Sequence, residues 1–310
     1  MLRLAGTIFA SCLLSIQLCL AQGKQHADNP LTGTIDFHCH TGPDASPRSI
    51  SDIDLARLAK KEGMRGIVLK NHYTMTADRA QIAMKEVGGI EVFGGIALNL
   101  SVGGLNAEAV RRMAAMEGHR GKVVWLPTVD AENSFEHGPG FRKFVSVVKD
   151  GKPVPELPEV FDVIAKNDLI LETGHSTPAE SLILIPAAKA AGIKKIIVTH
   201  AMLLGATIGQ MKQMADMGAV IEFCWQAYLP KKGDKNLVDQ KAIAQCVKAI
   251  QAIGAEYCII DSDLGQPGNP LHPDGMRAYI LALKANGLTA HDIDLVARKN
   301  PAKLLGLDAD

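Results

Sequence analysis

Eight short apolar segments that alternate with helical patterns constrain the fold of this 310-residue chain more than any other feature. Near-continuous apolar strands are typical of a parallel sheet covered on both faces, and the helices between them supply the crossovers. Eight β/α repeats predict an α/β fold of the (β/α)8 TIM-barrel type. The expected strands are 34–40, 65–72, 90–99, 122–130, 169–175, 195–200, 219–225 and 257–263.

A doubly wound parallel sheet is the alternative to the barrel. That fold would carry a glycine-rich phosphate-binding turn after its first strand. The first strand here ends instead in "HCH", residues 38–40. The sequence therefore argues against a nucleotide site and favours the barrel.

Several helix boundaries are marked by capping residues. Ser, Thr and Pro at a first turn, an acid or amide three residues later and a closing glycine are the signals of a helix start and stop. These signals begin helices at Ser51, Thr177 and Thr207 and end them at Gly63, Gly192 and Gly218. Further helices are expected over 236–253, 274–285 and 289–299, and Pro301 is expected to end the last one.

One connection, between the fourth and fifth strands, is long enough to hold an insertion. Its "FVSVVKDGKPV" stretch predicts a small hairpin around the turn at Asp150 and Gly151. Because this connection leaves the carboxyl end of a strand, we expect it to form a lid over the barrel mouth.

The first 21 residues have the layout of a secretory signal peptide. Arg3 precedes an apolar run that ends in small residues at Ala21. A membrane anchor is the alternative. We expect cleavage after Ala21, a single barrel domain over 22–310, and a periplasmic or secreted protein with no later membrane span.

Composition excludes some partners. The chain has 33 Lys and Arg residues against 33 Asp and Glu residues, so charge gives no argument for nucleic acid. Its expected partner is a small-molecule substrate, and homo-oligomerisation is left open. The four remaining cysteines form no CxxC pair and are expected to be small buried hydrophobes; they are Cys39, Cys224, Cys246 and Cys258.

Polar residues gather where the expected strands end. In a barrel, all these carboxyl ends open onto one face, which is where active sites lie. The residues are His38, His40, Lys70, His72, Asn99, Asp130, Glu172, His175, His200, Asp261 and Asp263.

The two histidines of the first strand define the start of a metal site. His38 and His40 are two residues apart, so both should point into the barrel while Cys39 faces the helices. Asp36 would share the histidines' face one step deeper, as a partner to the site or as a buried polar plug. Convergence of several imidazoles predicts a divalent metal, with zinc preferred and manganese, iron or nickel possible.

One or two ions fit this donor set. A pair of ions needs a bridging group, and Lys70, Asp130 and Glu172 are the candidates. Asp261 or Asp263 could accept a proton from a metal-activated water.

Taken together, these motifs resemble the amidohydrolase superfamily of metal-dependent hydrolases. The matching motifs are "HCH" at 38–40, "TGH" ending at His175, "VTH" ending at His200, "SD" ending at Asp263, and "NPAKLLGL" at 300–307. The resemblance spans the mature chain and implies that His38, His40, His175, His200 and Asp263 bind metal. It also favours Asp263 over Asp261 as the proton acceptor.

The chain departs from that superfamily on two strands. Members often carry a bridging Lys or Glu on the fourth strand, where this chain offers only Asp130. Its second strand instead ends in "KNH", so His72 is expected to be a further ligand or a substrate contact. His72 or Lys70 would stabilise developing negative charge.

Residues around the mouth suggest an anionic substrate. Arg48 and Arg79 follow the first two strands, and arginine suits bidentate binding of carboxylate or phosphate. Asn99 and His272 are further candidate contacts. The alternative for the arginines is a surface position near a helix start, and for His272 a plain turn.

Three functions remain after this reasoning. The first is a hydrolase acting on an amide, lactone, ester or phosphoester bond. The second is a decarboxylase, hydratase or isomerase using the same site. The third is a non-catalytic metal- or solute-binding protein.

Overall fold

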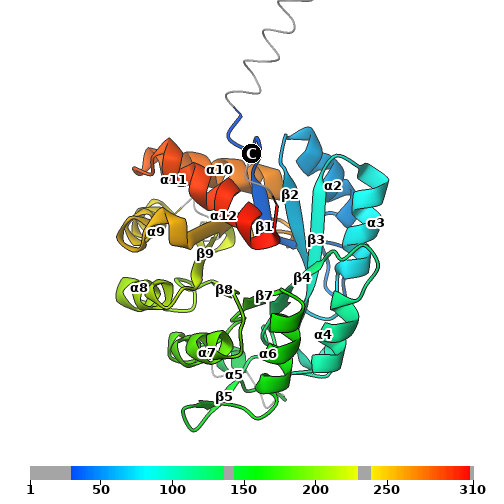
Figure 1. The fold of residues 1–310 in the computed structure, drawn as a ribbon. Helices are drawn as coiled ribbons and strands as arrows, with labels where there is room; N and C mark the ends of the chain where they lie inside the picture. Colours follow the sequence, from blue (N-terminus) through cyan, green and yellow to red (C-terminus); the bar gives the residue numbers. More distant parts are fainter. Residues whose placement is uncertain (1–28, 136–142, 230–238, 308–310) are drawn as a thin grey trace, which may run out of the picture.

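The computed structural model describes residues 29–135, 143–229 and 239–307, and Figure 1 shows helices surrounding a central sheet. Eight parallel strands follow one another in the order β1-β2-β3-β4-β7-β8-β9-β10. They are β1 (Ile35–His40), β2 (Gly66–Lys70), β3 (Glu91–Ala97), β4 (Gly121–Trp125), β7 (Ile170–Glu172), β8 (Lys195–Val198), β9 (Val220–Cys224) and β10 (Cys258–Asp261). The predicted (β/α)8 barrel is confirmed, and each expected strand is present.

The sheet closes between its first and last strands through the residues that follow β10. The backbone N–H of His40 donates to the carbonyl of Leu264 at 2.9 Å, and that of Asp263 donates to the carbonyl of His38 at 3.0 Å. We call this junction the β1–β10 seam. It places the histidines of β1 beside Asp263.

An outer layer of helices covers the barrel. Its members are α2 (Asp52–Lys61), α3 (Ala77–Val87), α4 (Ala107–Ala114), α6 (Leu157–Lys166), α7 (Pro178–Ala190), α8 (Ile208–Asp216), α9 (Gln240–Ile253) and α10 (His272–Ala285). Shorter elements are α5 (Glu132–Phe135), α11 (Ala290–Asp294), α12 (Asn300–Leu305), η1 (Leu100–Val102), η2 (Trp225–Tyr228), η3 (Ala255–Tyr257) and η4 (Leu295–Lys299). None of the helices in the described ranges combines the length and apolar character needed to cross a bilayer.

The predicted caps form as expected. Ser51 accepts from the backbone of Asp54 at the start of α2, and Thr177 and Thr207 form full capping boxes at α7 and α8. The prediction that Pro301 ends a helix is wrong. The chain continues through the π-helical turn η4 into α12, and Pro301 lies in the first turn, where its missing N–H breaks no helical bond.

Two apolar layers surround the strands. One lies between strands and helices, and the other fills the barrel interior around Phe37, Trp125 and Ile170. Leu304 and Leu305 of α12 pack into the interior layer, so α12 closes the amino-terminal end of the barrel (Figure 1). The polar residues lie at the opposite end of the barrel, where the strands finish.

The predicted hairpin is present as β5 (Val148–Lys149) and β6 (Lys152–Pro153), which pair antiparallel. Asp150 and Gly151 both have positive φ, as a two-residue hairpin turn requires. The hairpin contacts α7. Residues 136–142 of the expected lid lie outside the described residues, as does the expected signal peptide, 1–21.

Candidate metal centre

Three imidazoles face one carboxylate at the carboxyl end of the barrel. The Nε2 atoms of His38 and His40 lie 3.3 and 3.2 Å from Oδ1 of Asp263, and Nε2 of His200 lies 3.5 Å from Oδ2. All four side chains are at most 8% exposed. β1 contributes two of them, and the residues that follow β8 and β10 contribute the others.

Two further histidines complete a closed circle of five imidazoles. Neighbouring ring centroids are 4.7–6.3 Å apart all the way round. The order is His38, His40, His72, His175, His200 and back to His38. The five strand-end histidines are therefore brought together, but His72 and His175 lie farther from Asp263 than the other three.

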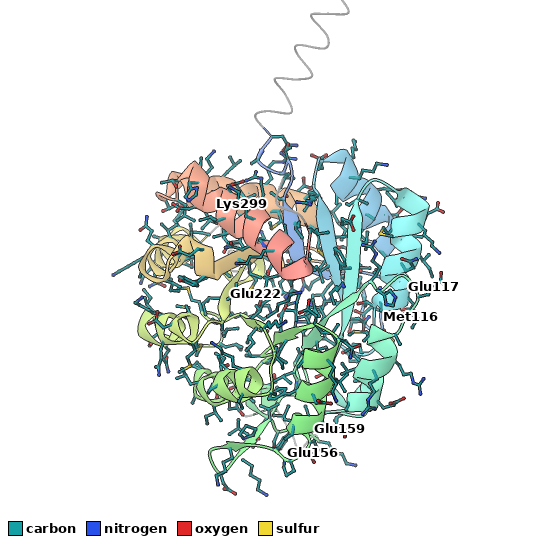
Figure 2. All side chains as sticks on the ribbon, in the orientation of Figure 1. Met116, Glu117, Glu156, Glu159, Glu222 and Lys299 are labelled. Atoms are coloured by element: carbon teal, nitrogen blue, oxygen red, sulfur yellow. The ribbon has the colours of Figure 1, made fainter. Side chains whose placement is uncertain are left out.

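Glu222 on β9 lies beneath this circle and was missed by sequence reasoning. One carboxylate oxygen accepts from Nδ1 of His38 at 3.0 Å; the other lies 3.0 Å from Nδ1 of His200 and accepts from the His200 backbone N–H at 2.7 Å. Figure 2 shows Glu222 inside the barrel, whereas Glu117 and Glu159 lie on its surface. A lone acid in the apolar "AVIEFCW" strand was the available signal.

This arrangement orients the rings. A carboxylate that engages Nδ1 directs the opposite nitrogen, Nε2, toward a metal and fixes the tautomer. The Nε2 atoms of His38 and His200 are the ones that face Asp263. Glu222 therefore orients the donor nitrogen of His38 through a hydrogen bond, and it lies 3.0 Å from Nδ1 of His200 without forming a hydrogen bond to that atom.

Two residues of the centre have strained backbones. His200 and Asp263 adopt φ values of +48° and +51°, in the left-handed region that side chains disfavour. Such conformations persist where surrounding contacts hold them, and they concentrate at functional sites. Here the backbone N–H of His200 donates a hydrogen bond to the Glu222 carboxylate, and the backbone N–H of Asp263 donates one to the carbonyl of His38.

Burial keeps the imidazoles neutral. It lowers the pKa of His38 to about 4 and that of His40 to about 3, with the Lys70 charge adding to the effect at both. The pKa of Asp263 stays well below its usual range: burial opposes this, but His38 and His200 outweigh it. At neutral pH His38 and His40 thus offer unprotonated nitrogens beside an ionised carboxylate, which is the state metal binding needs.

The donor spacing fits a metal ion. Ligands about 2.0–2.2 Å from a tetrahedral ion lie roughly 3.3–3.6 Å from one another. The distances from Oδ1 of Asp263 to Nε2 of His38 and His40, 3.3 and 3.2 Å, are close to this spacing. Nε2 of His200 lies 3.5 Å from the other oxygen, Oδ2. Nε2 of His38 is also buried without a hydrogen-bond partner among the described residues.

The candidate bridging groups occupy different places. Lys70 is fully buried 5.2 Å from the Trp125 ring centroid, and its Nζ has no hydrogen-bond partner within the described ranges. Glu172 accepts from the hydroxyl of Thr199 at 2.9 Å, and burial raises its pKa well above the usual value. Asp130 accepts from the backbone N–H of Leu100 at 2.9 Å and so holds the turn η1.

Asp261 and Asp36 lie on either side of the β1–β10 seam. Burial, followed by the nearby Glu222 charge, raises the pKa of Asp261 well above its usual value, and Asp263 is the residue that faces the histidines. Asp36 accepts from the backbone of Ser262 at 2.9 Å and of His38 at 3.3 Å. A register shift after Asp36 interrupts the alternation expected for β1. The contacts with His38 and Ser262 support the first of the two roles expected for Asp36, a partner to the metal site, over a buried polar plug.

Asn99 holds His72 in place. Its amide donates to the carbonyl of His72 at 2.8 Å and to Oγ1 of Thr128 at 2.7 Å, and its oxygen accepts from the backbones of Thr128 and Asp130. All its hydrogen-bonding positions are therefore used within the chain. The substrate contact expected for Asn99 would have to replace one of these bonds.

The two arginines are also engaged within the chain. Arg79 forms a two-pronged ion pair with Asp52 at 2.7 and 2.8 Å. Arg48 donates to Asp44 at 2.6 Å, and both side chains are buried. The structure thus places Arg48 in a contact within the β1–α2 loop and Arg79 in a contact between α3 and α2, and substrate binding would compete with these partners.

His272 begins α10 and is fully buried. Burial lowers its pKa to about 4, although the backbone groups of Leu264 and His40 act in the opposite direction. Neither of its ring nitrogens has a hydrogen-bond partner among the described residues.

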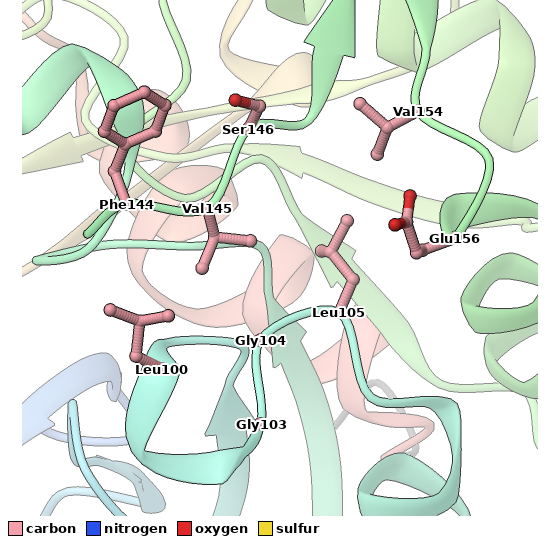
Figure 3. Close-up of a pocket in the computed structure, with 9 residues that line it drawn as sticks. All are labelled: Leu100, Gly103, Gly104, Leu105, Phe144, Val145, Ser146, Val154 and Glu156. Atoms are coloured by element: carbon pink, nitrogen blue, oxygen red, sulfur yellow. The ribbon is translucent and has the colours of Figure 1, made fainter.

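A pocket of about 370 Å³ opens where η1 meets the segment before β5. Figure 3 shows Leu100 and Val145 pointing toward each other across it, with Phe144 beside them. Leu100 and Phe144 are 42% and 45% exposed, which is high for apolar side chains. Leu100 follows Asn99 directly, so this pocket begins one residue from the group that holds His72.

Solved structures share this fold. An organophosphorus hydrolase from Deinococcus radiodurans matches with a TM-score of 0.60 at 15% identity, over 89% of this chain and 93% of its own. A PTE-like lactonase mutant from the same organism matches with a TM-score of 0.59 at 14% identity, over 89% and 96%. A proposed 2-pyrone-4,6-dicarboxylic acid hydrolase from Pseudomonas putida matches with a TM-score of 0.56 at 14% identity, over 90% and 99%.

Sequence comparison gives a different kind of result. No protein of curated function matches the chain. One family profile matches residues 33–222, which run from the start of β1 to Glu222 and include all five histidines of the circle. The chain therefore belongs to DUF6282, a family of unknown function.

Proposed function

We propose that this protein is a metal-dependent hydrolase that cleaves a small-molecule substrate with water. The observation that carries this proposal is the convergence of three imidazole nitrogens on the carboxylate of Asp263. The fold shared with structures named as hydrolases agrees with it. Zinc is the preferred ion because imidazole and carboxylate ligands suit it.

Different residues of the chain would bind the metal, accept a proton and orient the imidazole rings. His38, His40 and Asp263 would hold the ion, with His200 at the second oxygen of the same carboxylate. The ion would polarise the substrate and bring the pKa of a water toward 7. Asp263 would also accept the proton of the attacking water at a carboxylate oxygen. Glu222 would keep the two imidazoles above it in the required tautomer.

His72 is assigned to the substrate rather than to the metal. Its Nδ1 lies 2.8 Å from Oγ1 of Thr128, which already accepts from Asn99. If the threonine hydroxyl donates to Nδ1, then the His72 ring carries its proton on Nε2. His72 would therefore donate to developing negative charge on the substrate.

Thr128→Val tests this assignment because it removes the hydroxyl donor and keeps the shape. We expect kcat to fall while bound metal per chain is unchanged. Loss of metal with unchanged kcat per bound ion would show that His72 is a ligand instead.

The substrate is proposed to be anionic. Lys70 is a fully buried cation with no hydrogen-bond partner among the described residues, close to the circle of imidazoles. A bound anion would give its Nζ the hydrogen-bond acceptor that it lacks among the described residues. The bond cleaved is an amide, lactone, ester or phosphoester.

Metal removal and reconstitution test the function directly. The purified chain would be stripped with a chelator, reloaded with one divalent metal at a time, and assayed on lactones, phosphoesters, amides and esters. Carboxylated aromatic compounds in the same panel would reveal decarboxylation instead. Turnover that survives complete metal removal, or metal-loaded protein inactive on every hydrolytic substrate, would overturn the proposal.

We also propose that the chain is exported and acts in the periplasm or outside the cell. Arg3, the apolar run after it and the small residues near Ala21 support this. Sequencing the amino terminus of protein recovered from a secreting host tests it. Full-length protein retained in the cytoplasm would contradict it.

A further inference from the structure

The two carboxylate oxygens of Asp263 face different histidines. Oδ1 lies 3.3 and 3.2 Å from the Nε2 atoms of His38 and His40, both on β1. Oδ2 lies 3.5 Å from Nε2 of His200, which follows β8. This division leaves room for two cation positions on one carboxylate rather than one.

Cys224 stands beside the second of these positions. One ligand atom each of His200, Cys224 and Asp263 lie within 4.8 Å of one another, and all three residues are buried. Around a tetrahedral zinc ion, sulfur and nitrogen ligands lie about 3.6 Å apart. Side-chain shifts of about 1 Å or less would therefore bring the three into coordination.

The surroundings of Cys224 separate it from the other cysteines. Among the four free cysteines that the structure describes, three pack in the apolar layer between strands and helices: Cys39, Cys246 and Cys258. Cys224 belongs to neither apolar layer of the described residues. It lies two positions after Glu222 on β9, so both side chains point to the same side of the strand.

Burial and the nearby carboxylates of Asp263 and Asp261 raise the pKa of the Cys224 thiol well above its usual value, so the thiol keeps its proton until a bound cation displaces it.

We propose that His200, Cys224 and Asp263 form a second cation position with a thiolate ligand, and that Asp263 bridges it to the His38–His40 position. The inference rests on the proposed metal centre and deepens it. Binding would release the thiol proton to solvent as the metal–sulfur bond forms. A thiolate ligand favours zinc, cobalt or cadmium over magnesium, calcium or manganese.

Cobalt titration of the metal-free full-length protein tests the proposal. We expect two Co²⁺ ions per chain and a sulfur-to-cobalt charge-transfer band in the near ultraviolet. In Cys224→Ala and Cys224→Ser, the band should disappear and the stoichiometry should fall from two to one. Cys258→Ala is the matched control, because Cys258 is equally buried at the opposite end of the neighbouring strand, and it should retain both ions and the band.

X-ray absorption of the zinc-loaded wild-type protein gives a reading that depends on no variant. It should show a sulfur neighbour at about 2.3 Å. A spectrum with only nitrogen and oxygen neighbours, or a charge-transfer band that survives in Cys224→Ala, would overturn the second position.

The outcomes also separate this inference from the proposed function. Metal-dependent hydrolysis by a protein that binds one ion with no sulfur ligand would leave the function standing and refute the thiolate position. Failure to bind any divalent metal would refute both.

Discussion

Replacing Glu222 with glutamine tests whether this carboxylate presents the nitrogens of His38 and His200 to a metal. Glu222 contacts Nδ1 of each ring at 3.0 Å and accepts from the His200 backbone at 2.7 Å. Glutamine keeps the shape but has one acceptor oxygen, so its amide N–H₂ would face a ring N–H. One ring must then rotate or move its proton to Nε2, and either change removes a lone pair from the centre.

The size of the effect follows from that loss. Removing an outer partner of a ligating histidine lowers metal affinity roughly 10- to 100-fold, which corresponds to about 1.4–2.7 kcal/mol. Metal affinity would be measured by titration against a competing chelator at neutral pH. The ¹⁵N chemical shifts of the histidine rings would be read in the metal-free protein, where they report the tautomers without any metal present.

Glu172→Gln provides the matched control. Glu172 is equally buried on a nearby strand, but its hydrogen bond is with Thr199 rather than with an imidazole. It should leave the histidine tautomers of the metal-free protein unchanged. If Glu222→Gln binds zinc as tightly as the wild type and its ring shifts do not move, the orienting role of Glu222 is refuted.

Three further predictions concern the same framework. Asp263→Asn should lower kcat roughly 10²- to 10⁴-fold while a metal ion stays bound, and full activity in that variant would remove its role as proton acceptor. Arg79→Ala leaves a buried carboxylate unpaired and should lower the unfolding free energy by about 3 kcal/mol; denaturant titration measures this, and an unchanged midpoint would contradict it. Metal-free protein should lose stability as pH falls from about 6.5 toward 4. In the folded state the pKa values of His38 and His40 are about 4 and 3, so both rings stay unprotonated over this range, whereas the same histidines bind protons in the unfolded state. Asp36, whose pKa burial raises to about 6, acts in the opposite direction over part of that range, and unfolding midpoints that rise on acidification would contradict the prediction.

The barrel was predictable because its signals are local. Apolar strands, capping residues such as Thr177 and closing glycines each act within a few positions, and each formed as expected. The convergence of His38, His40 and His200 followed from topology alone, since all parallel strands of a barrel end at one face.

Other features depended on tertiary contacts that no local pattern encodes. Glu222 stands alone in an apolar strand, and its function becomes visible only when two imidazoles from distant strands meet it. Arg79 and Asp52 are 27 positions apart, so their ion pair could not be separated from a free arginine at the mouth. The register shift in β1 depends on how that strand fits its neighbour β2.

The position of the proposed metal centre at the β1–β10 seam implies that a bound ion would also stabilise the closed barrel. Its donors lie on both sides of the junction: His38 and His40 on β1, and Asp263 after β10. His38 and Ser262, which meet there, are 224 positions apart in the sequence. An ion bound across this junction would cross-link the first and last strands of the barrel. A cross-link that closes a long loop removes more conformational entropy from the unfolded chain than one that closes a short loop. Metal loading should therefore slow hydrogen exchange first at the seam, in the strands that begin and finish the barrel.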